Sequence, residues 1–216
     1  LFRSNDVPYT VARVANVLNL PSISVESSLL FTNKLLMKDA FFKSGVACPW
    51  FTGVESIEQF VDAVHDRAKQ KYVLKPTDGR GARGVLIIDG DIDLSWAFNE
   101  SKSWGESGQL ILEKFVDGMQ LSTESFLLDG VCYTPAISAR NYARTDQFKP
   151  NIIEDGGTIP ADISDDLYVD INDLILRGAK ALGITHGLVK GDLVIDKNGK
   201  PQIIELAARI SGGWLK

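Results

Sequence analysis

The chain has 216 residues, of which 44% are hydrophobic and 24% are charged, and its formal net charge is -5. These values are typical of a globular protein and exclude a wholly disordered chain. The acidic balance argues against a general binder of nucleic acid or of an anionic membrane. Two cysteines are too few for a disulfide framework or a four-cysteine zinc site, which favours a reduced, cytoplasmic compartment.

The first third of the chain is predicted to be mainly helical. Pro21 ends the first helix, Thr32 is the predicted N-cap of the second with Gly45 as its stop, and Ser56 with Gln59 forms a capping-box pattern for the third. The expected elements are, in order, helices over 10–20 and 33–44, an extended piece over 48–52, and a helix from 56 to about 70.

Strands predominate in the remainder. Strands are expected at 72–74, 85–88, 109–115, 121–128, 131–137, 188–195 and 202–206, and helices at 94–104 and 164–182. Residues 138–160 are rich in turn formers and are predicted to be an irregular excursion. Helices mixed with antiparallel strands indicate an α+β fold.

A glycine-rich segment, KPTDGRGARGV, begins at Lys75, and its Gly79, Gly81 and Gly84 spell G-x-G-x-x-G. A dinucleotide-binding loop would open a helix, whereas a β run follows here, and a protein-kinase loop would require H-R-D and D-F-G, which are absent. Two interpretations stay open. One is an ordinary basic surface loop, and the other is a mobile loop that folds over a triphosphate beside the charge of Lys75.

A hairpin near the end of the chain brings two carboxylates together. Asn198-Gly199 predicts a two-residue turn that pairs Lys197 with Lys200, and the same register places Asp192 opposite Glu205. Two like charges in apolar strands need compensation, and Mg²⁺ prefers carboxylate oxygen. We therefore favour a Mg²⁺ site over a solvated acidic edge.

Taken in this order, these features resemble the ATP-grasp superfamily, most closely its carbamoyl-phosphate-synthase-like carboxylate–amine ligases. The resemblance implies an ATP-grasp fold with two α+β lobes and the nucleotide bound between them. It implies ATP and Mg²⁺ (or Mn²⁺) as cofactors, with Asp192 and Glu205 as metal ligands and Arg209 as the catalytic phosphate arginine. The implied nucleotide-binding residues are Lys34, Lys75, Gly79, Gly81, Gly84, Glu113, Lys114, Phe115, Val116 and Glu124.

Substrate contacts are expected from residues that could hold an anion. Arg140 and Arg144 suit a substrate carboxylate, and Ser211, Gly212 and Gly213 allow backbone N–H groups to face an anion. The partners implied are small-molecule carboxylate and amine substrates, without nucleic acid or membrane, and a homo-oligomer is left open.

The resemblance also implies a domain scheme. Residues 1–25 correspond to the tail of an N-terminal α/β domain, 26–118 to a small lobe, and 119–216 to a large lobe that is expected to continue beyond this sequence. Two positions depart from the family pattern, since Ala207 replaces the usual asparagine ligand and Gln120 replaces a ribose-binding acid, with Glu124 nearby. The expected activity is an ATP-dependent ligase that activates a carboxylate as an acylphosphate for attack by an amine or ammonia. A non-catalytic nucleotide-binding module is the alternative.

Overall fold

The computed structural model describes residues 7–66 and 70–212. These residues fall into two compact units. The first comprises the described residues up to Cys48, Asp117–Asn141 and the described residues from Gly156 onward, and the second comprises Pro49–Val116 and Tyr142–Asp155. Each unit has its own antiparallel sheet and its own hydrophobic core.

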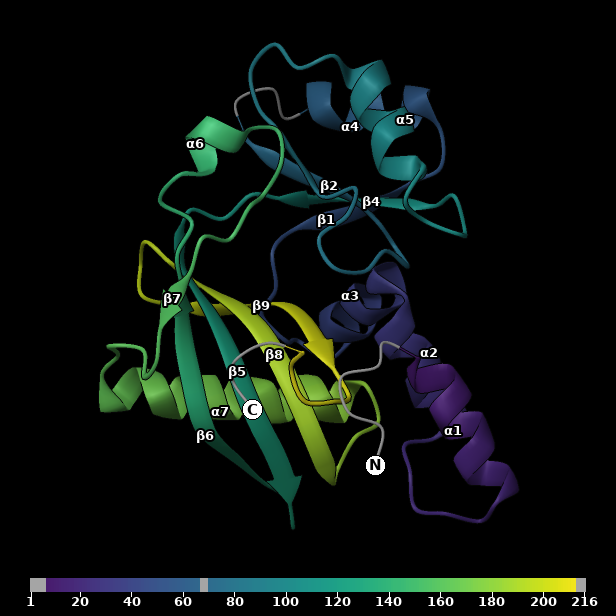
Figure 1. Cartoon of the computed structure of the whole chain (residues 1–216), viewed down its shortest axis with the longest axis vertical. Coiled ribbons are helices and arrows are strands. Elements are labelled where there is room, and N and C mark those ends of the chain that lie inside the picture. Colours follow the sequence, from purple (N-terminus) through teal and green to yellow (C-terminus); the bar gives the residue numbers. More distant parts are fainter. Residues whose placement is uncertain (1–6, 67–69, 213–216) are drawn as a thin grey trace. The chain divides into compact units, whose positions relative to one another are not determined.

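A five-stranded sheet forms the centre of the first unit, in the order β7-β6-β5-β8-β9. The long helix α7 (Asp165–Ala181) crosses one face of this sheet (Figure 1). It buries Ile171, Leu174 and Ile175 in one core with Leu193 and Ile203 of the strands. The opposite face is left for polar side chains. The strands are β5 (Gly118–Leu128), β6 (Val131–Arg140), β7 (Gly157–Thr158), β8 (Gly187–Asp196) and β9 (Pro201–Ala207).

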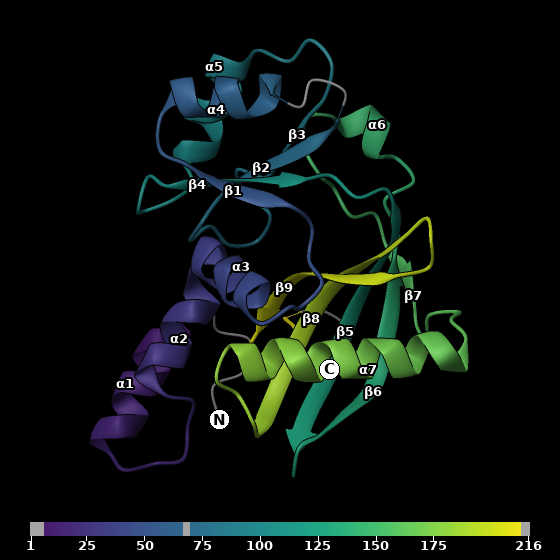
Figure 2. The ribbon, with the colours of Figure 1, turned by 180° about the vertical axis from the view of Figure 1, so that it is seen from behind.

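Three N-terminal helices complete the first unit: α1 (Pro8–Val17), α2 (Val25–Thr32) and α3 (Lys34–Lys43). The predicted N-cap Thr32 is wrong, because it ends α2, and Asn33 caps α3 by accepting from Leu35 N and Leu36 N. Helix α2 was not predicted, and its Ser27 and Ser28 are buried where apolar residues are usual. Helix α3 lies beside β9 in both views (Figures 1 and 2).

The second unit contains a four-stranded sheet in the order β1-β4-β2-β3, with α4 and α5 on one side of it (Figure 2). The rings of Phe60 on α4 and Phe98 on α5 stack at 6.3 Å in its core. The elements are β1 (Phe51–Val54), α4 (Ile57–His65), β2 (Tyr72–Pro76), β3 (Leu86–Ile88), α5 (Leu94–Lys102), β4 (Leu110–Lys114) and the short α6 (Thr145–Phe148).

The predicted α+β class is confirmed, and most predicted elements are present with shifted ends. The segment 138–160 is more regular than predicted, because β6 continues to Arg140 and α6 and β7 follow. Residues 33–44, which the predicted scheme joins to 49–118, belong in the structure to the same unit as α7 and β9. The domain boundaries at 25 and 118 stay a prediction. Within the described ranges, no helix is both long and apolar enough to cross a membrane.

Candidate functional site

The two predicted carboxylates face each other on neighbouring strands of the first unit. Asp192 on β8 has Ser122 on β5 and Glu205 on β9 as its direct cross-strand partners. Directly opposed side chains point to the same face of a sheet, so the two carboxylates share one face. The structure therefore confirms the predicted pairing of Asp192 with Glu205.

The hairpin turn itself differs from the predicted one. Asp196 N donates to Lys200 O at 3.0 Å, which closes a three-residue loop, and Gly199 adopts φ = 75°. Such loops, with glycine in the left-handed region, are a common alternative to the two-residue turn. The predicted pairing of Lys197 with Lys200 is therefore wrong. The strands leave this turn one residue away from the predicted register.

A β-bulge restores the predicted register before it reaches the carboxylates. Leu193 lies opposite Ile203, whereas Asp192 lies opposite Glu205, so Ile204 is the extra residue on β9. If β9 kept the regular register of the turn and formed no bulge at Ile204, Glu205 would lie opposite Gly191 and would point to the opposite face. The bulge, rather than the turn, places the two carboxylates together.

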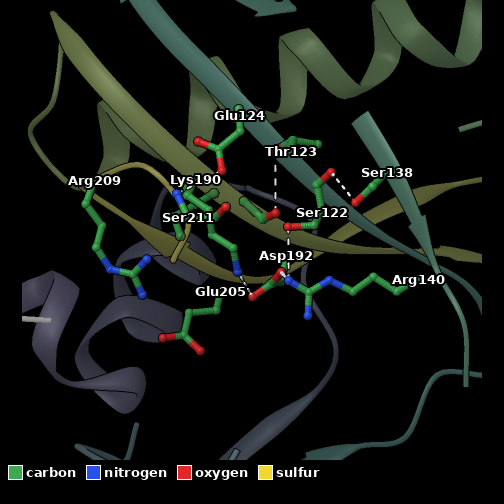
Figure 3. Close-up of polar contacts among 12 residues, drawn as sticks. Ser122, Thr123, Glu124, Ser138, Arg140, Lys190, Asp192, Glu205, Arg209 and Ser211 are labelled. Atoms are coloured by element: carbon green, nitrogen blue, oxygen red, sulfur yellow. Dashed lines mark hydrogen bonds and ion pairs between the residues drawn. The ribbon is translucent and has the colours of Figure 1, made fainter. Parts of the chain in front are cut away.

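Two cations surround the Asp192 carboxylate (Figure 3). Arg140 Nη2 lies 3.0 Å from Asp192 Oδ1 and 3.1 Å from the Ser122 hydroxyl oxygen, to which it donates. Lys190 Nζ forms an ion pair with the other oxygen. Burial by itself raises the pKa of Asp192, but the charges of Lys190 and Arg140 outweigh burial and hold that pKa below its usual range. Asp192 is thus ionised at neutral pH.

This lowered pKa gives a pH-dependent prediction. A carboxyl whose pKa is lower in the folded than in the unfolded state stabilises the fold above the unfolded value, about 3.9 for Asp, and loses that contribution as the pH falls through the folded value. The native chain is therefore expected to be more stable than the Asp192→Asn variant at neutral pH. This difference in unfolding free energy is expected to become smaller as the pH falls below about 4. Denaturant unfolding of both proteins across the acid range checks this, and a difference independent of pH would contradict it.

The Glu205 carboxylate is paired with a helix residue. Lys34 Nζ lies 3.6 Å from Glu205 Oε1, and the two side chains are 12% and 33% exposed. Lys34 is the first residue of α3, directly after the Asn33 cap. The structure thus brings the predicted phosphate lysine to one of the predicted metal ligands. Figure 3 shows Glu205 extending to the side on which Arg209 lies.

These two carboxylates fit a divalent cation that also binds phosphate. Mg²⁺ in such sites commonly takes one or two carboxylates and fills its other positions with phosphate oxygen and water. Asp192 and Glu205 supply that number from facing positions. In the part of the chain that the structure describes, no group of three or more His, Cys, Asp or Glu side chains gathers. The donor set therefore suits a cation that brings its own phosphate ligands.

The segment after β9 is tied to β5. Ser211 N donates to Glu124 Oε1 at 2.8 Å, and Arg209 Nη1 donates to Ile210 O at 3.0 Å. Glu124 is the direct cross-strand partner of Lys190, the lysine that forms an ion pair with Asp192. Its carboxylate here anchors the Ser211 backbone, and its role as a ribose ligand stays a prediction. Gly212 is exposed, and Gly213 lies outside the described residues.

In the second unit, a buried ion pair joins two residues that the sequence analysis treated separately. Lys75 Nζ on β2 lies 2.9 Å from Glu113 Oε1 on the adjacent strand β4. Their side chains are 6% and 4% exposed. The predicted phosphate lysine and the predicted adenine-side carboxylate therefore neutralise each other in this structure.

The glycine-rich loop joins β2 to β3, as predicted, and these strands pair antiparallel. Gly81 and Gly84 adopt φ of 64° and 70°, a region that favours glycine. The loop ends are anchored, because Asp78 Oδ2 accepts from Ser107 N at 2.8 Å and Ser101 Oγ donates to Gly84 O at 2.8 Å. Residues 80–83 between these anchors are exposed. The loop's mobility and its contact with a triphosphate stay predictions.

The remaining predicted residues of the second unit have other partners. At the end of β4, Lys114 N donates to Trp50 O at 2.8 Å and Phe115 N donates to Lys71 O at 2.9 Å, with half-buried Val116 following. Arg144 Nε lies 2.7 Å from Asp155 Oδ2. Arg140 and Arg144 belong to different units. A joint role in binding one substrate carboxylate stays a prediction.

Three residues that contact the carboxylate pair or its strands were not predicted: Ser122 beside Asp192, Lys190 paired with Asp192, and the buried Lys38 of α3, which donates to Ile203 O on β9. Lys190 had a readable signal, since Lys190-Gly-Asp192 in a strand places both charges on one face. The other two carried none, because their partners come from distant parts of the sequence.

The sequence model of the ATP-grasp domain matches residues 31–213. A D-alanine–D-alanine ligase from Gloeobacter violaceus is 27% identical over 84% of this chain and 60% of its own length. An L-arginine-specific L-amino acid ligase from Bacillus subtilis is 25% identical over 88% of this chain and 46% of its own length.

A solved structure supports the same fold. The crystal structure of an L-amino acid ligase from Bacillus licheniformis superimposes with a TM-score of 0.75 at 23% identity, covering 94% of this chain and 47% of that one. The chain thus spans about half the length of the relatives it matches. Because the family model covers most of the sequence, the chain belongs to the ATP-grasp domain family.

Proposed function

We propose that this chain binds ATP with Mg²⁺ (or Mn²⁺) and is the nucleotide-binding part of an ATP-dependent carboxylate–amine ligase. The observation that carries the proposal is the pairing of Asp192 with Glu205 on one sheet face, with Lys34, Lys190 and Arg140 around them. The D-alanine–D-alanine and L-amino acid ligases to which the chain is similar support the reaction class. The identity of acid and amine is left open by this support.

In the first unit, we assign the metal and phosphate contacts. Asp192 and Glu205 hold the cation through their carboxylate oxygens. Lys34, within ion-pair distance of Glu205, is well placed to move its charge to a phosphate oxygen. Arg209 is assigned the charge of the transferring phosphoryl group. When bound, Mg²⁺ neutralises the triphosphate charge and polarises its oxygens.

In the second unit, the nucleotide contacts are assigned from the family resemblance. Lys75 and the backbone N–H groups of the loop from Gly79 to Gly84 are assigned to phosphate. Glu113 to Val116 are assigned to the adenine edge. The buried ion pair with Glu113 restricts the Lys75 side chain to one orientation. Less side-chain conformational entropy is therefore lost when Lys75 binds phosphate.

The proposed reaction has two steps. A substrate carboxylate oxygen attacks the γ-phosphorus of ATP, the bond to the ADP oxygen breaks, and an acylphosphate forms. An amine or ammonia then attacks the acyl carbon, inorganic phosphate leaves with the bonding electrons, and the nitrogen loses a proton. The residues of this chain position the reactants and neutralise charge, which is the main contribution of proteins to phosphoryl transfer.

Nucleotide binding is the first prediction of this proposal. Calorimetric titration of the chain with a non-hydrolysable ATP analogue and Mg²⁺ is expected to show one site. Chelation of the metal is expected to weaken binding by about tenfold or more, since the cation offsets repulsion between carboxylates and phosphates. Binding that is absent, or equal with and without the metal, would contradict the proposal.

A phosphate-release assay separates the ligase from the non-catalytic module. The chain is incubated with ATP, Mg²⁺ and paired panels of amino acids, and the phosphate released is compared with that from ATP alone. A ligase is expected to release phosphate only with particular acids and amines. Binding of the analogue without phosphate release for any pair of acid and amine would favour the binding module.

A further inference from the structure

A lysine on helix α3 has no part in the proposed chemistry and yet is fully buried. Lys38 is 0% exposed, and Met37 and Phe41 of the same helix are buried as well. Its Nζ donates to the main-chain carbonyl of Ile203 at 3.0 Å. Burying an ammonium group is costly, and an apolar residue of similar length would avoid that cost. The contact with Ile203 is therefore the feature to explain.

Ile203 is the residue directly before the β-bulge. Strand β9 is at the edge of its sheet, so its outward N–H and C=O groups have no neighbouring strand. Helix α3 and the segment after it occupy that edge: Lys38 Nζ binds Ile203 O, and Ala47 O accepts from Ile203 N at 2.9 Å. Beyond the bulge, Leu206 N lies 3.4 Å from Met37 Sδ.

The same helix also reaches the carboxylate that the bulge places. Lys34 lies one turn before Lys38 on α3, and its Nζ is 3.6 Å from Glu205 Oε1. Side chains one turn apart thus contact β9 on both sides of the extra residue Ile204. Since the bulge decides which face Glu205 occupies, a contact that fixes the bulge also fixes the acid pair.

We propose that Lys38 is a positioning residue: by binding Ile203 O it holds the bulge at Ile204 and keeps Glu205 opposite Asp192. The inference rests on the proposed function only for its effect on nucleotide binding, because the register of β8 and β9 can be measured without ATP. Loss of the Lys38 contact favours the regular register, in which Asp192 lies opposite Ile204 and Glu205 lies opposite Gly191.

The test compares Lys38→Met with Lys43→Met, an exposed lysine on the same helix. Cross-strand nuclear Overhauser contacts report the register without nucleotide, and analogue titrations with Mg²⁺ and with a chelator report function. Lys38→Met is expected to lose the 192–205 contacts and to lose about tenfold or more of its Mg²⁺-dependent affinity, as for other residues that orient metal ligands. The affinity of Lys38→Met for the analogue in the presence of the chelator is expected to equal that of the native chain. Lys43→Met is expected to match the native chain in every measurement.

Deletion of Ile204 distinguishes positioning from simple destabilisation. The deletion removes the extra residue, so regular pairing from the turn then places Glu205 opposite Asp192 without a bulge to hold. In the Lys38→Met background, the deletion is expected to restore the 192–205 contacts and most of the Mg²⁺-dependent affinity. A residue that merely stabilises the fold would give no such rescue, since the deletion adds a second perturbation.

Three outcomes would overturn the inference: an unchanged register in Lys38→Met, an affinity loss with the native register, or no recovery of the 192–205 contacts in the deletion. If Lys38→Met is too unstable to study, Lys38→Arg, which keeps a donor, is expected to keep the native register, and a shifted register there would also overturn it. If the native chain fails to bind the analogue, the proposed function fails, while the register measurements still decide the role of Lys38.

Discussion

Replacing Glu205 by Gln is expected to reduce Mg²⁺-dependent binding of an ATP analogue by about two orders of magnitude, or about 2.7 kcal/mol. The amide keeps the size of the side chain but removes the negative charge that a hard cation requires. Glu205 is 33% exposed and pairs with Lys34 at 3.6 Å, so its removal is expected to leave the fold intact. Titration in the presence and absence of Mg²⁺ measures the effect.

The matched control is Glu26→Gln, which makes the same change at an exposed position of the same unit. It is expected to bind the analogue as the native chain does. Asp192→Asn is expected to resemble Glu205→Gln, although it also leaves Lys190 and Arg140 without their carboxylate. Native affinity in both single variants would mean that the two carboxylates do not hold the metal.

Replacing Lys75 by Met is expected to destabilise the second unit by about 3–5 kcal/mol, because the Glu113 charge would be buried beside an apolar side chain. Three of the four tryptophans, Trp50, Trp96 and Trp104, belong to this unit, so in chains that carry Trp214→Phe the tryptophan fluorescence during urea unfolding reports its stability. The midpoint is expected to fall well below that of the native chain.

Two controls separate the buried pair from ordinary charge effects. The double variant Lys75→Met/Glu113→Leu removes both charges and is expected to recover most of the lost stability, since no uncompensated charge is left. Lys71→Met breaks an ion pair with Asp89 in which the lysine is 50% exposed, and it is expected to cost less than about 1 kcal/mol. Equal losses from Lys71→Met and Lys75→Met would contradict the assigned burial effect.

The carboxylate pair shows how far the sequence could lead. Asn198-Gly199 located the hairpin, and the pairing of Asp192 with Glu205 is confirmed, although the turn has three residues and not two. The error of one residue at the turn was cancelled by the bulge at Ile204. A bulge depends on contacts from outside the hairpin, here from α3, and local turn propensity carries no information on such contacts.

Pairings between distant segments explain most of what was missed. The ion pair of Lys75 with Glu113 joins residues 38 positions apart in sequence (113 − 75), and it follows from the strand order β4-β2, which the pattern of predicted strands leaves open. Capping could be predicted where the motif is local, as at Ser56, which accepts from Gln59 N. At the start of α3, Asn33 takes the capping role that was predicted for Thr32, because α2 extends to Thr32.

The location of the bound metal decides whether Asp192 and Glu205 form the metal site. A crystal of the chain with a non-hydrolysable ATP analogue and Mn²⁺ would reveal the metal by its anomalous scattering. We expect a peak within about 2.0–2.4 Å of carboxylate oxygens from both Asp192 and Glu205, and in contact with phosphate oxygen. A metal held by the nucleotide and other side chains, with Asp192 still engaged by Lys190 and Arg140, would contradict it.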